Sequence, residues 1–247
     1  MHAAPLTPGA HDRPRHLNVK SRPMNLALFD LDHTLIPTDS DHEWGRFLVR
    51  LGVVDEESYR RKNDEFYTQY KAGTLDIQAF LRFALAPLAA NPRDRLDQWR
   101  VRFMHEVIEP VITPQARALV YKHLEAGDLC AVVTATNSFV TSPIAQAFGI
   151  KHLIATEPET IDGKPESAFT GEVAGVPSFR EGKITRVDSW LKSMGAKWDD
   201  FGSTTFYSDS ANDLPLLEKV SEPIAANPDD RLRNHAAAAG WRIMDLF

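Results

Sequence analysis

The sequence predicts an α/β fold: a three-layer core in which helices cover both faces of a parallel sheet, with an all-helical segment inserted after the first strand. Two observations support this fold class. Short apolar runs alternate with helical segments over residues 113–225, an alternation typical of parallel βαβ units. Before them, residues 39–110 show helical periodicity and are punctuated by Gly52, Gly73 and Asn91-Pro92, with no strand pattern.

The composition excludes several classes of function. The chain has 247 residues, a formal net charge of −6 and one cysteine, Cys130. A single cysteine excludes an intramolecular disulfide and a four-thiolate zinc site. An acidic chain is poorly suited to sequence-independent nucleic-acid binding, and no apolar run approaches the roughly 20 residues that span a bilayer. We therefore predict a cytoplasmic protein that binds neither nucleic acid nor membrane.

The first 110 residues fall into three parts. Residues 1–23 are rich in Pro, His and Arg and contain no apolar signal segment, so we expect a disordered or loosely ordered leader. The short run that starts at Asn25 is apolar from Leu26 to Phe29 and ends in acids, which indicates a buried parallel strand. Helices are then expected at 43–51, 56–71, 76–87 and 92–108. The predicted domains are a core of 24–38 and 111–247 and a helical cap of 39–110.

The remaining residues alternate between the two kinds of element. Helices are expected at 114–126, 143–148, 181–194 and 214–219. Strands are expected at 129–133, 153–155, 204–207 and 224–225, with a small hairpin within 169–175. Each strand that is followed by a helix forms part of a crossover unit, so these strands are expected to extend one parallel sheet.

Polar residues follow three of the predicted strands. Asp30 and Asp32 come after the first strand, Thr134 after the second, and Asp209 and Asp213 after the fourth. Ligands of open parallel sheets bind beyond the carboxyl ends of the strands, so these groups are expected to converge. A fourth segment supplies the ammonium of Lys183, which lies near the start of the helix expected at 181–194.

These residue types point to phosphate chemistry. Carboxylates at Asp30, Asp32 and Asp209 would repel one another without a cation, and oxygen ligands favour Mg²⁺. A carboxylate can attack phosphorus and form an aspartyl-phosphate, and a second acid can protonate the leaving oxygen. The hydroxyl of Thr134 and the ammonium of Lys183 can hold phosphoryl oxygens. The sequence thus predicts Mg²⁺-dependent hydrolysis of a phosphate monoester.

The motif order resembles one enzyme family. Asp30-Leu-Asp32-His-Thr, a Thr after the second strand, a Lys and an Asp-x-x-x-Asp pair occur in the order found in the haloacid dehalogenase-like (HAD) superfamily. The phosphoserine-phosphatase-like branch, subfamily IB, also has a helical cap after strand one. The resemblance implies a Rossmann-like core, with Ser208 in place of a glycine usual in the family. It also implies the following roles: Asp30 as nucleophile, Asp32 as general acid and base, Thr134, Ala135 and Lys183 as phosphate-binding residues, Asp30, the backbone carbonyl of Asp32 and Asp209 as Mg²⁺ ligands, and Asp213 as a support of the metal site.

The cap residues bear on the substrate. Phosphoserine phosphatases bind the substrate ammonium with a glutamate nine residues after the nucleophile, where this chain has Asp39. Asp39 is also placed to cap the first cap helix, with Asp41 as a rival. Ala84 aligns with the arginine that binds the substrate carboxylate in those enzymes, and Arg82 falls on nearly the opposite helix face. An amine site without a carboxylate-binding arginine favours a phosphorylated amino alcohol.

A narrower resemblance suggests which amino alcohol. Residues 134–142 and 178–183 are similar to a bacterial subgroup assigned to histidinol-phosphate hydrolysis, and L-histidinol phosphate has an ammonium and an imidazole but no carboxylate. In this interpretation Asn137 also binds substrate. Four aromatic residues either pack against the imidazole or form the cap's own core: Trp44, Phe47, Phe66 and Tyr67.

The predicted partner is therefore a small phosphorylated metabolite, and L-histidinol phosphate is the preferred candidate. The oligomeric state is not predicted. Phosphoserine or another small phosphate ester is the alternative substrate, and phosphoryl transfer between substrates is a further alternative reaction. A phosphate-binding protein without activity, or one resembling a receiver domain, is the alternative from another class. Receiver domains carry their acidic pair before Thr and Lys and have no such insertion, whereas here an acidic pair follows Lys183.

Overall fold

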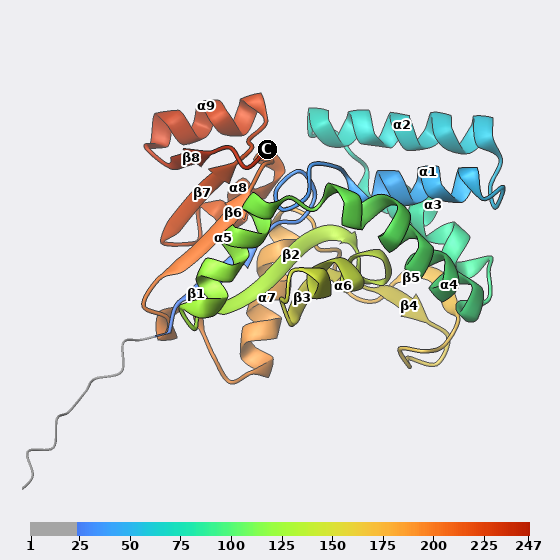
Figure 1. Ribbon diagram of the computed structural model, residues 1–247. Helices are drawn as coiled ribbons and strands as arrows, with labels where there is room; N and C mark the ends of the chain where they lie inside the picture. Colours follow the sequence, from blue (N-terminus) through green and yellow to red (C-terminus); the bar gives the residue numbers. More distant parts are fainter. Residues whose placement is uncertain (1–23) are drawn as a thin grey trace, which may run out of the picture.

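The computed structural model describes residues 24–247, so the expected leader at 1–23 lies outside the described residues. Six strands form one parallel sheet in the order β3-β2-β1-β6-β7-β8 (Figure 1). The strands are β1 (Leu26–Phe29), β2 (Leu129–Asn137), β3 (His152–Thr156), β6 (Thr204–Ser208), β7 (Glu222–Ala226) and β8 (Arg242–Met244). The α/β fold class predicted from the sequence is confirmed.

Helices cover both faces of the sheet, so β1 is buried on both sides. Ala27 and Phe29 face α5 (Pro114–Glu125) and α6 (Ser138–Ala147) in one apolar cluster. Leu26 and Leu28 face α7 (Glu181–Ser193), α8 (Leu214–Leu217) and α9 (Asp230–Ala239) in a second cluster. All four β1 side chains are fully or almost fully buried, which explains why this strand reads as an unbroken apolar run.

Residues 40–111 fold into helices, as their periodicity predicts. These are α1 (Ser40–Arg50), α2 (Glu56–Ala72), α3 (Ile77–Ala89) and α4 (Arg93–Phe103), with a π-helical turn at Met104–Ile108 and a 3₁₀ turn at Glu109–Val111. The side chains of Asp39, Asp55 and Asp76 accept backbone N–H groups at the first turns of α1, α2 and α3. Each aspartate therefore fixes where its helix begins.

The aromatic residues of this segment separate into two groups. Trp44 and Phe47 are buried and contact the ring of Phe103 at centroid distances of 5.2 and 5.6 Å, so they belong to the core of the helical segment. Phe66 and Tyr67 instead line a cavity. Of the two interpretations left open by the sequence, membership of the cap's own core therefore holds for Trp44 and Phe47.

A two-stranded antiparallel hairpin, β4 (Pro158–Thr160) and β5 (Phe169–Val173), packs on the helical segment. A Cβ atom on Gly171 would lie 3.2 Å from the Cβ of Ala89 in the turn at the end of α3. Arg93 of α4 donates hydrogen bonds to the backbone carbonyls of Pro165 and Ser167, at 2.6 and 3.3 Å. The division into a cap of 39–110 and a core of 24–38 and 111–247 remains our proposal. The hairpin belongs to the core by sequence but packs against the cap helices α3 and α4.

Four local expectations were wrong. β2 continues through Asn137 after a change of register beyond Val133, so it is longer than 129–133. α6 begins at Ser138, and Pro143 lies inside it, because the Asn137 side chain accepts the N–H of Val140 and caps the helix there. Residues 169–175 contribute one hairpin strand and not a whole hairpin. α9 and β8 were not predicted.

Two side chains of the α/β core, Arg180 and Asn212, bind the C-terminal end of α2. The Arg180 guanidinium donates to the carbonyl of Gly73, and Asn212 Nδ2 donates to the carbonyl of Tyr70 at 3.1 Å. Arg180 also donates to Asn212 Oδ1 at 3.2 Å. Both side chains donate to carbonyls at the C-terminal end of the helix, where no further helical N–H groups follow.

None of the helices over residues 24–247 is long and apolar enough to cross a membrane.

Candidate active site

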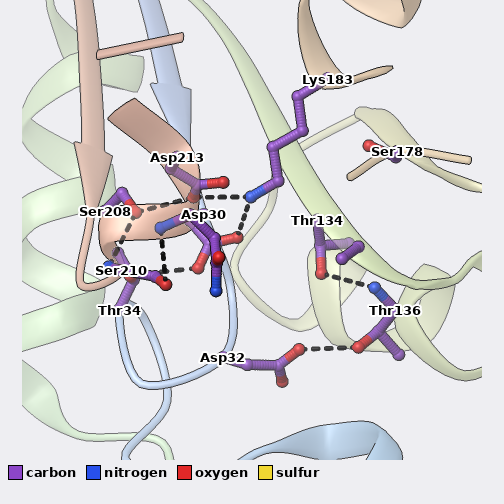
Figure 2. A network of polar contacts seen from close by, with 12 residues as sticks. Asp30, Asp32, Thr34, Thr134, Thr136, Ser178, Lys183, Ser208, Ser210 and Asp213 are labelled. Atoms are coloured by element: carbon purple, nitrogen blue, oxygen red, sulfur yellow. Dashed lines mark hydrogen bonds and ion pairs between the residues drawn. The ribbon is translucent and has the colours of Figure 1, made fainter. Parts of the chain in front are cut away.

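A buried ion-pair cluster lies at the carboxyl end of the central strands (Figure 2). Lys183 Nζ lies 2.8 Å from Asp30 Oδ1 and 2.7 Å from Asp213 Oδ2. Asp30 follows β1, Asp213 follows β6, and Lys183 comes from the first turn of α7, so three distant segments meet here. Lys183 is only 1% exposed. The sequence-predicted convergence of these three residues is therefore observed.

Burial and pairing act in opposite directions on these groups. Burial raises the pKa of Asp30 above its ordinary value, although Lys183 opposes this, and burial raises the pKa of Asp213 to about 6 in spite of the same ammonium. Burial also acts to lower the pKa of Lys183, but the charges of Asp213 and Asp30 raise it more. Lys183 consequently stays charged at neutral pH.

Thr34 joins Asp30 to Asp209. Its Oγ1 accepts the backbone N–H of Asp209 at 3.0 Å and lies 3.2 Å from Asp209 Oδ1 and 3.3 Å from Asp30 Oδ2. A hydroxyl has one hydrogen, so it can donate to only one of these two carboxylates at a time. Burial, and then the charges of Asp30 and Asp213, raise the pKa of Asp209 well above its ordinary value. The cluster therefore has more negative charge than its donors can balance.

This donor set fits a hard divalent cation such as Mg²⁺. Asp30 and Asp209 supply anionic oxygens that share a single neutral donor, and oxygen is the ligand type that Mg²⁺ prefers. Over residues 24–247, no group of three or more His, Cys, Asp or Glu side chains is arranged to hold a metal ion. The expected ligand set contains two carboxylates and one backbone carbonyl, so it does not depend on such a group.

The carboxyl group of Asp32 is held apart from this cluster (Figure 2). Its Oδ1 accepts the backbone N–H of Ser40 at 2.7 Å, and its Oδ2 accepts the hydroxyl of Thr136 at 2.8 Å. Burial, followed by the charge of Asp39, raises the pKa of Asp32 to about 6. A carboxyl group that titrates near neutral pH is suited to donate a proton in one step and accept it in another.

Thr134 lies on the part of β2 that extends beyond the predicted strand 129–133. Its Oγ1 accepts the backbone N–H of Thr136 at 3.2 Å, and the residue is 1% exposed. Thr134, Ala135 and Thr136 all line the same cavity as Asp30 and Asp32. A hydroxyl and backbone N–H groups beside a buried carboxylate are the kind of donors that hold phosphoryl oxygens.

The two expected substrate contacts have structural partners in the protein. Asp39 Oδ1 accepts the backbone N–H groups of Asp41 and His42 at 3.0 and 2.8 Å, so Asp39 caps α1 while it also lines the cavity. Asn137 caps α6 and donates through Nδ2 to Asp41 Oδ1 at 3.3 Å. Asn137 is not among the residues that line the cavity.

The cavity is acidic and aromatic. Neither Lys nor Arg occurs among the described residues that line it. Ala84 is buried and Arg82 is exposed on the other side of α3, as expected from their spacing. The lining residues are Asp30, Asp32, Asp39, Asp41, His42, Asn63, Phe66, Tyr67, Tyr70, Leu75, Ile77, Phe80, Thr134, Ala135, Thr136 and Phe179.

Sequence reasoning missed three polar residues of the site. Thr34 completes the Asp-x-Asp-x-Thr motif but received no role, although the motif itself could have identified it. Thr136 follows Thr134 by two residues, a spacing that puts two strand side chains on one face, so this signal was also present. The hydrogen bond from the Ser40 N–H to Asp32 depends on the path of the loop between β1 and α1, which no local sequence pattern shows.

Comparisons with known proteins agree with this geometry. The family model of haloacid dehalogenase-like hydrolases matches residues 27–218. A histidinol-phosphatase from Neisseria meningitidis serogroup C (strain 8013) is 47% identical over 223 residues, 90% of this chain and 99% of the relative. A crystal structure of a protein with unknown function from Bordetella pertussis Tohama I is 53% identical, with a TM-score of 0.85 over 91% of this chain and 99% of that chain. A substrate-bound phosphoserine phosphatase is 20% identical, with a TM-score of 0.64 over 91% and 93%, a likeness of fold.

Proposed function

The chain belongs to the haloacid dehalogenase-like hydrolase family and is a phosphoric monoester hydrolase of its phosphoserine-phosphatase-like branch, and from this premise we propose that its substrate is L-histidinol phosphate. The observation that carries the proposal is the lining of the cavity, which has four carboxylates and five aromatic rings but, within the described residues, no Lys or Arg. A substrate with an ammonium and an aromatic ring matches this lining. A substrate carboxylate, as in phosphoserine, would meet acids and no cationic partner.

The phosphate end of the substrate is bound by residues of the α/β core. In this proposal Thr134 and the backbone N–H of Ala135 donate to phosphoryl oxygens, and the Lys183 ammonium balances their charge. Asp30, Asp209 and the backbone carbonyl of Asp32 would hold Mg²⁺, which supplies further positive charge beside the phosphoryl group. Asp213 positions Lys183 through their 2.7 Å contact.

The reaction proceeds in two steps at Asp30. A carboxylate oxygen of Asp30 attacks phosphorus, the ester P–O bond breaks, and Asp32 gives its proton to the leaving alkoxide, which departs as L-histidinol. Asp32, now a carboxylate, then removes a proton from a water molecule that attacks the phosphorus of the aspartyl-phosphate. Inorganic phosphate leaves, Asp30 is a free carboxylate again and Asp32 carries a proton. The pKa of about 6 at Asp32 suits both halves of this exchange.

Phosphate release from a panel of monoesters tests this proposal. The panel contains L-histidinol phosphate, L-phosphoserine, a sugar phosphate and a nucleotide, each with Mg²⁺ and with excess chelator. We expect preferred, Mg²⁺-dependent hydrolysis of L-histidinol phosphate, and a loss of at least about 10³-fold in kcat for Asp30→Asn, which removes the nucleophile. A preference for L-phosphoserine would contradict the substrate assignment and leave the two-step chemistry standing. Release that is insensitive to Asp30→Asn would contradict the mechanism.

A further inference from the structure

The cavity contains two carboxylates beyond those of Asp30 and Asp32, namely Asp39 and Asp41. Neither forms an ion pair with a Lys, Arg or His of residues 24–247. Carboxylates removed from bulk water need donors or a cation to remain charged. The number of such donors differs between the two residues, and this difference separates their roles.

Asp39 is stabilised by the helix that it caps. Its Oδ1 accepts the N–H groups of Asp41 and His42, at the positive end of α1. Asp41 accepts no backbone N–H, and its one hydrogen bond within the described residues comes from Asn137 at 3.3 Å. Burial, and then the charges of Asp39 and Asp32, raise the pKa of Asp41 well above its ordinary value. Asp41 is thus the carboxylate that lacks compensation.

Asn137 holds Asp41 in a defined position. The Oδ1 of Asn137 accepts the N–H of Val140 at 3.2 Å, so its amide NH₂ must point toward Asp41. Asn137 is 2% exposed and lies three residues after Thr134 on the same strand, β2. One strand therefore carries both a hydroxyl of the phosphate end and the side chain that positions the Asp41 carboxylate.

A neighbouring polar atom also lacks a partner. His42 lines the cavity, and its Nδ1 is buried without a hydrogen-bond partner within the described part of the chain. Its Nε2 faces Asp64 at 3.6 Å, which leaves Nδ1 as the acceptor when the ring is neutral. Burial lowers the pKa of His42, which favours that neutral form. Buried acceptors of this kind are usually satisfied by water or by a ligand, so this wall of the cavity is suited to a ligand that donates.

We propose that Asp41 binds the ammonium group of the substrate and thereby selects amine-bearing phosphate esters, while Asp39, the residue expected for this role from the sequence, serves to begin α1. The inference rests on the proposed function and deepens it, because it names the group of the substrate that the cap recognises. The ammonium would supply the positive charge that Asp41 lacks in this cavity.

Two matched variants test the proposal. Asp41→Asn removes the charge and keeps the shape and the acceptor for Asn137. Asp39→Asn removes the other charge, and asparagine caps helices as well as aspartate does. Each variant is assayed with two pairs of esters that differ only in the amine: L-histidinol phosphate against 3-(imidazol-4-yl)propyl phosphate, and O-phosphoethanolamine against ethyl phosphate. Thermal unfolding of the ligand-free proteins at pH 7 is measured alongside.

For Asp41→Asn we expect KM to rise at least tenfold for the amine-bearing ester, with kcat/KM for the amine-free partner changed less than threefold. Asp39→Asn should change the two esters equally. The ligand-free Asp41→Asn protein should unfold at a higher temperature than the wild type, because an uncompensated carboxyl has been removed. Equal losses on both esters of a pair, or a larger amine-specific loss in Asp39→Asn, would overturn the proposal.

The same assays distinguish this inference from the proposed function. A wild-type enzyme that prefers the amine-bearing ester of both pairs but fails to favour L-histidinol phosphate on the wider panel would contradict the substrate and leave the role of Asp41 supported. A wild-type enzyme that does not distinguish the amine-bearing from the amine-free esters would contradict the role of Asp41, whichever ester it hydrolyses best.

Discussion

Lys183 contacts two buried carboxylates, those of Asp30 and Asp213. Its removal leaves both carboxylates without their ion-pair partner in a site from which water is excluded. We expect Lys183→Met to lower the free energy of unfolding by about 3–5 kcal/mol, the usual cost of breaking a buried pair. Urea unfolding measures this loss, and Lys192→Met, an exposed change on the same helix, is the control.

A second substitution separates charge from packing at this site. Asp213→Asn removes one of the carboxylates that Lys183→Met leaves unpaired, so the double variant should recover part of the lost stability. Losses that simply add in the double variant, or a loss for Lys183→Met no larger than that for Lys192→Met, would show that the ion pair does not determine stability here.

Cys130 lies on β2 and is 4% exposed. Burial, and then the charge of Asp128, raise the pKa of its thiol to about 12. At pH 8 the reactive thiolate is then on the order of one part in 10⁴, compared with a substantial fraction for a free thiol. We expect iodoacetamide to modify the native protein far more slowly than the urea-unfolded chain, as measured by mass spectrometry. Equal rates for native and unfolded protein would contradict this.

Several site residues could be predicted individually because of where strands end. Asp30 and Asp213 follow apolar runs that form adjacent parallel strands, and the carboxyl ends of such strands meet at one edge. The role of Thr34 between Asp30 and Asp209 depends on a contact across 175 residues of sequence, which spacing alone does not give. Asp41 was predicted only as a helix cap, because its burial depends on how α1 packs against β2.

The C-terminal end of α2 is one of the places where the helical segment is attached to the core. Arg180 donates to the carbonyl of Gly73 there, and its loss should weaken this attachment. We expect Arg180→Met to accelerate amide hydrogen exchange along Glu56–Ala72, with little change in the strands. The control is Arg186→Met, since Arg186 instead binds the carbonyls of Ala174 and Val176. Similar exchange along α2 in both variants would contradict this role of Arg180.

Elements with strong periodicity or clear caps were predicted well, and elements shaped by tertiary contacts were not. α2 has Asp55 before it and Gly73 after it, the latter in the left-handed region at φ 72°. The sequence at the end of β2 resembles that of a loop because it contains small polar residues. In the structure, pairing with β3 is irregular after Val133 and resumes at Asn137, opposite Thr156. In α9, the buried residues are Leu232 and Ala236, an apolar face too short to detect in the sequence.

At the scale of the whole molecule, the site is built from the sheet and closed by the helical segment. Asp30 and Asp209 lie on the sheet side, and a cation that binds the folded protein and not the unfolded chain must stabilise the fold. We expect Mg²⁺ without substrate to raise the melting temperature of the wild type, and Asp209→Asn to abolish most of this shift. Asp94→Asn, an exposed change on α4, is the control. An equal shift in all three proteins would contradict the proposed ligand set.

The closing of the helical segment over the sheet also gives an expectation for the whole molecule. The insertion follows the nucleophile directly, so its position can depend on whether phosphate is bound. We expect a phosphate mimic with Mg²⁺ to slow proteolysis within 39–110, as followed by mass spectrometry of the fragments. Cleavage at the same rate with and without the mimic would count against closure upon binding.

The place of β1 in the sheet has a consequence for how the protein is made. Leu26 pairs with Leu129 on one side and Thr204 on the other, so β1 acquires its second neighbour only after β6 has been translated. At about 5–20 residues per second, that delay is roughly 10–35 s. Until β6 is made, an apolar strand with at least one open edge is exposed to other nascent chains. Productive biosynthesis therefore depends on keeping Leu26–Phe29 shielded until the C-terminal third of the chain arrives.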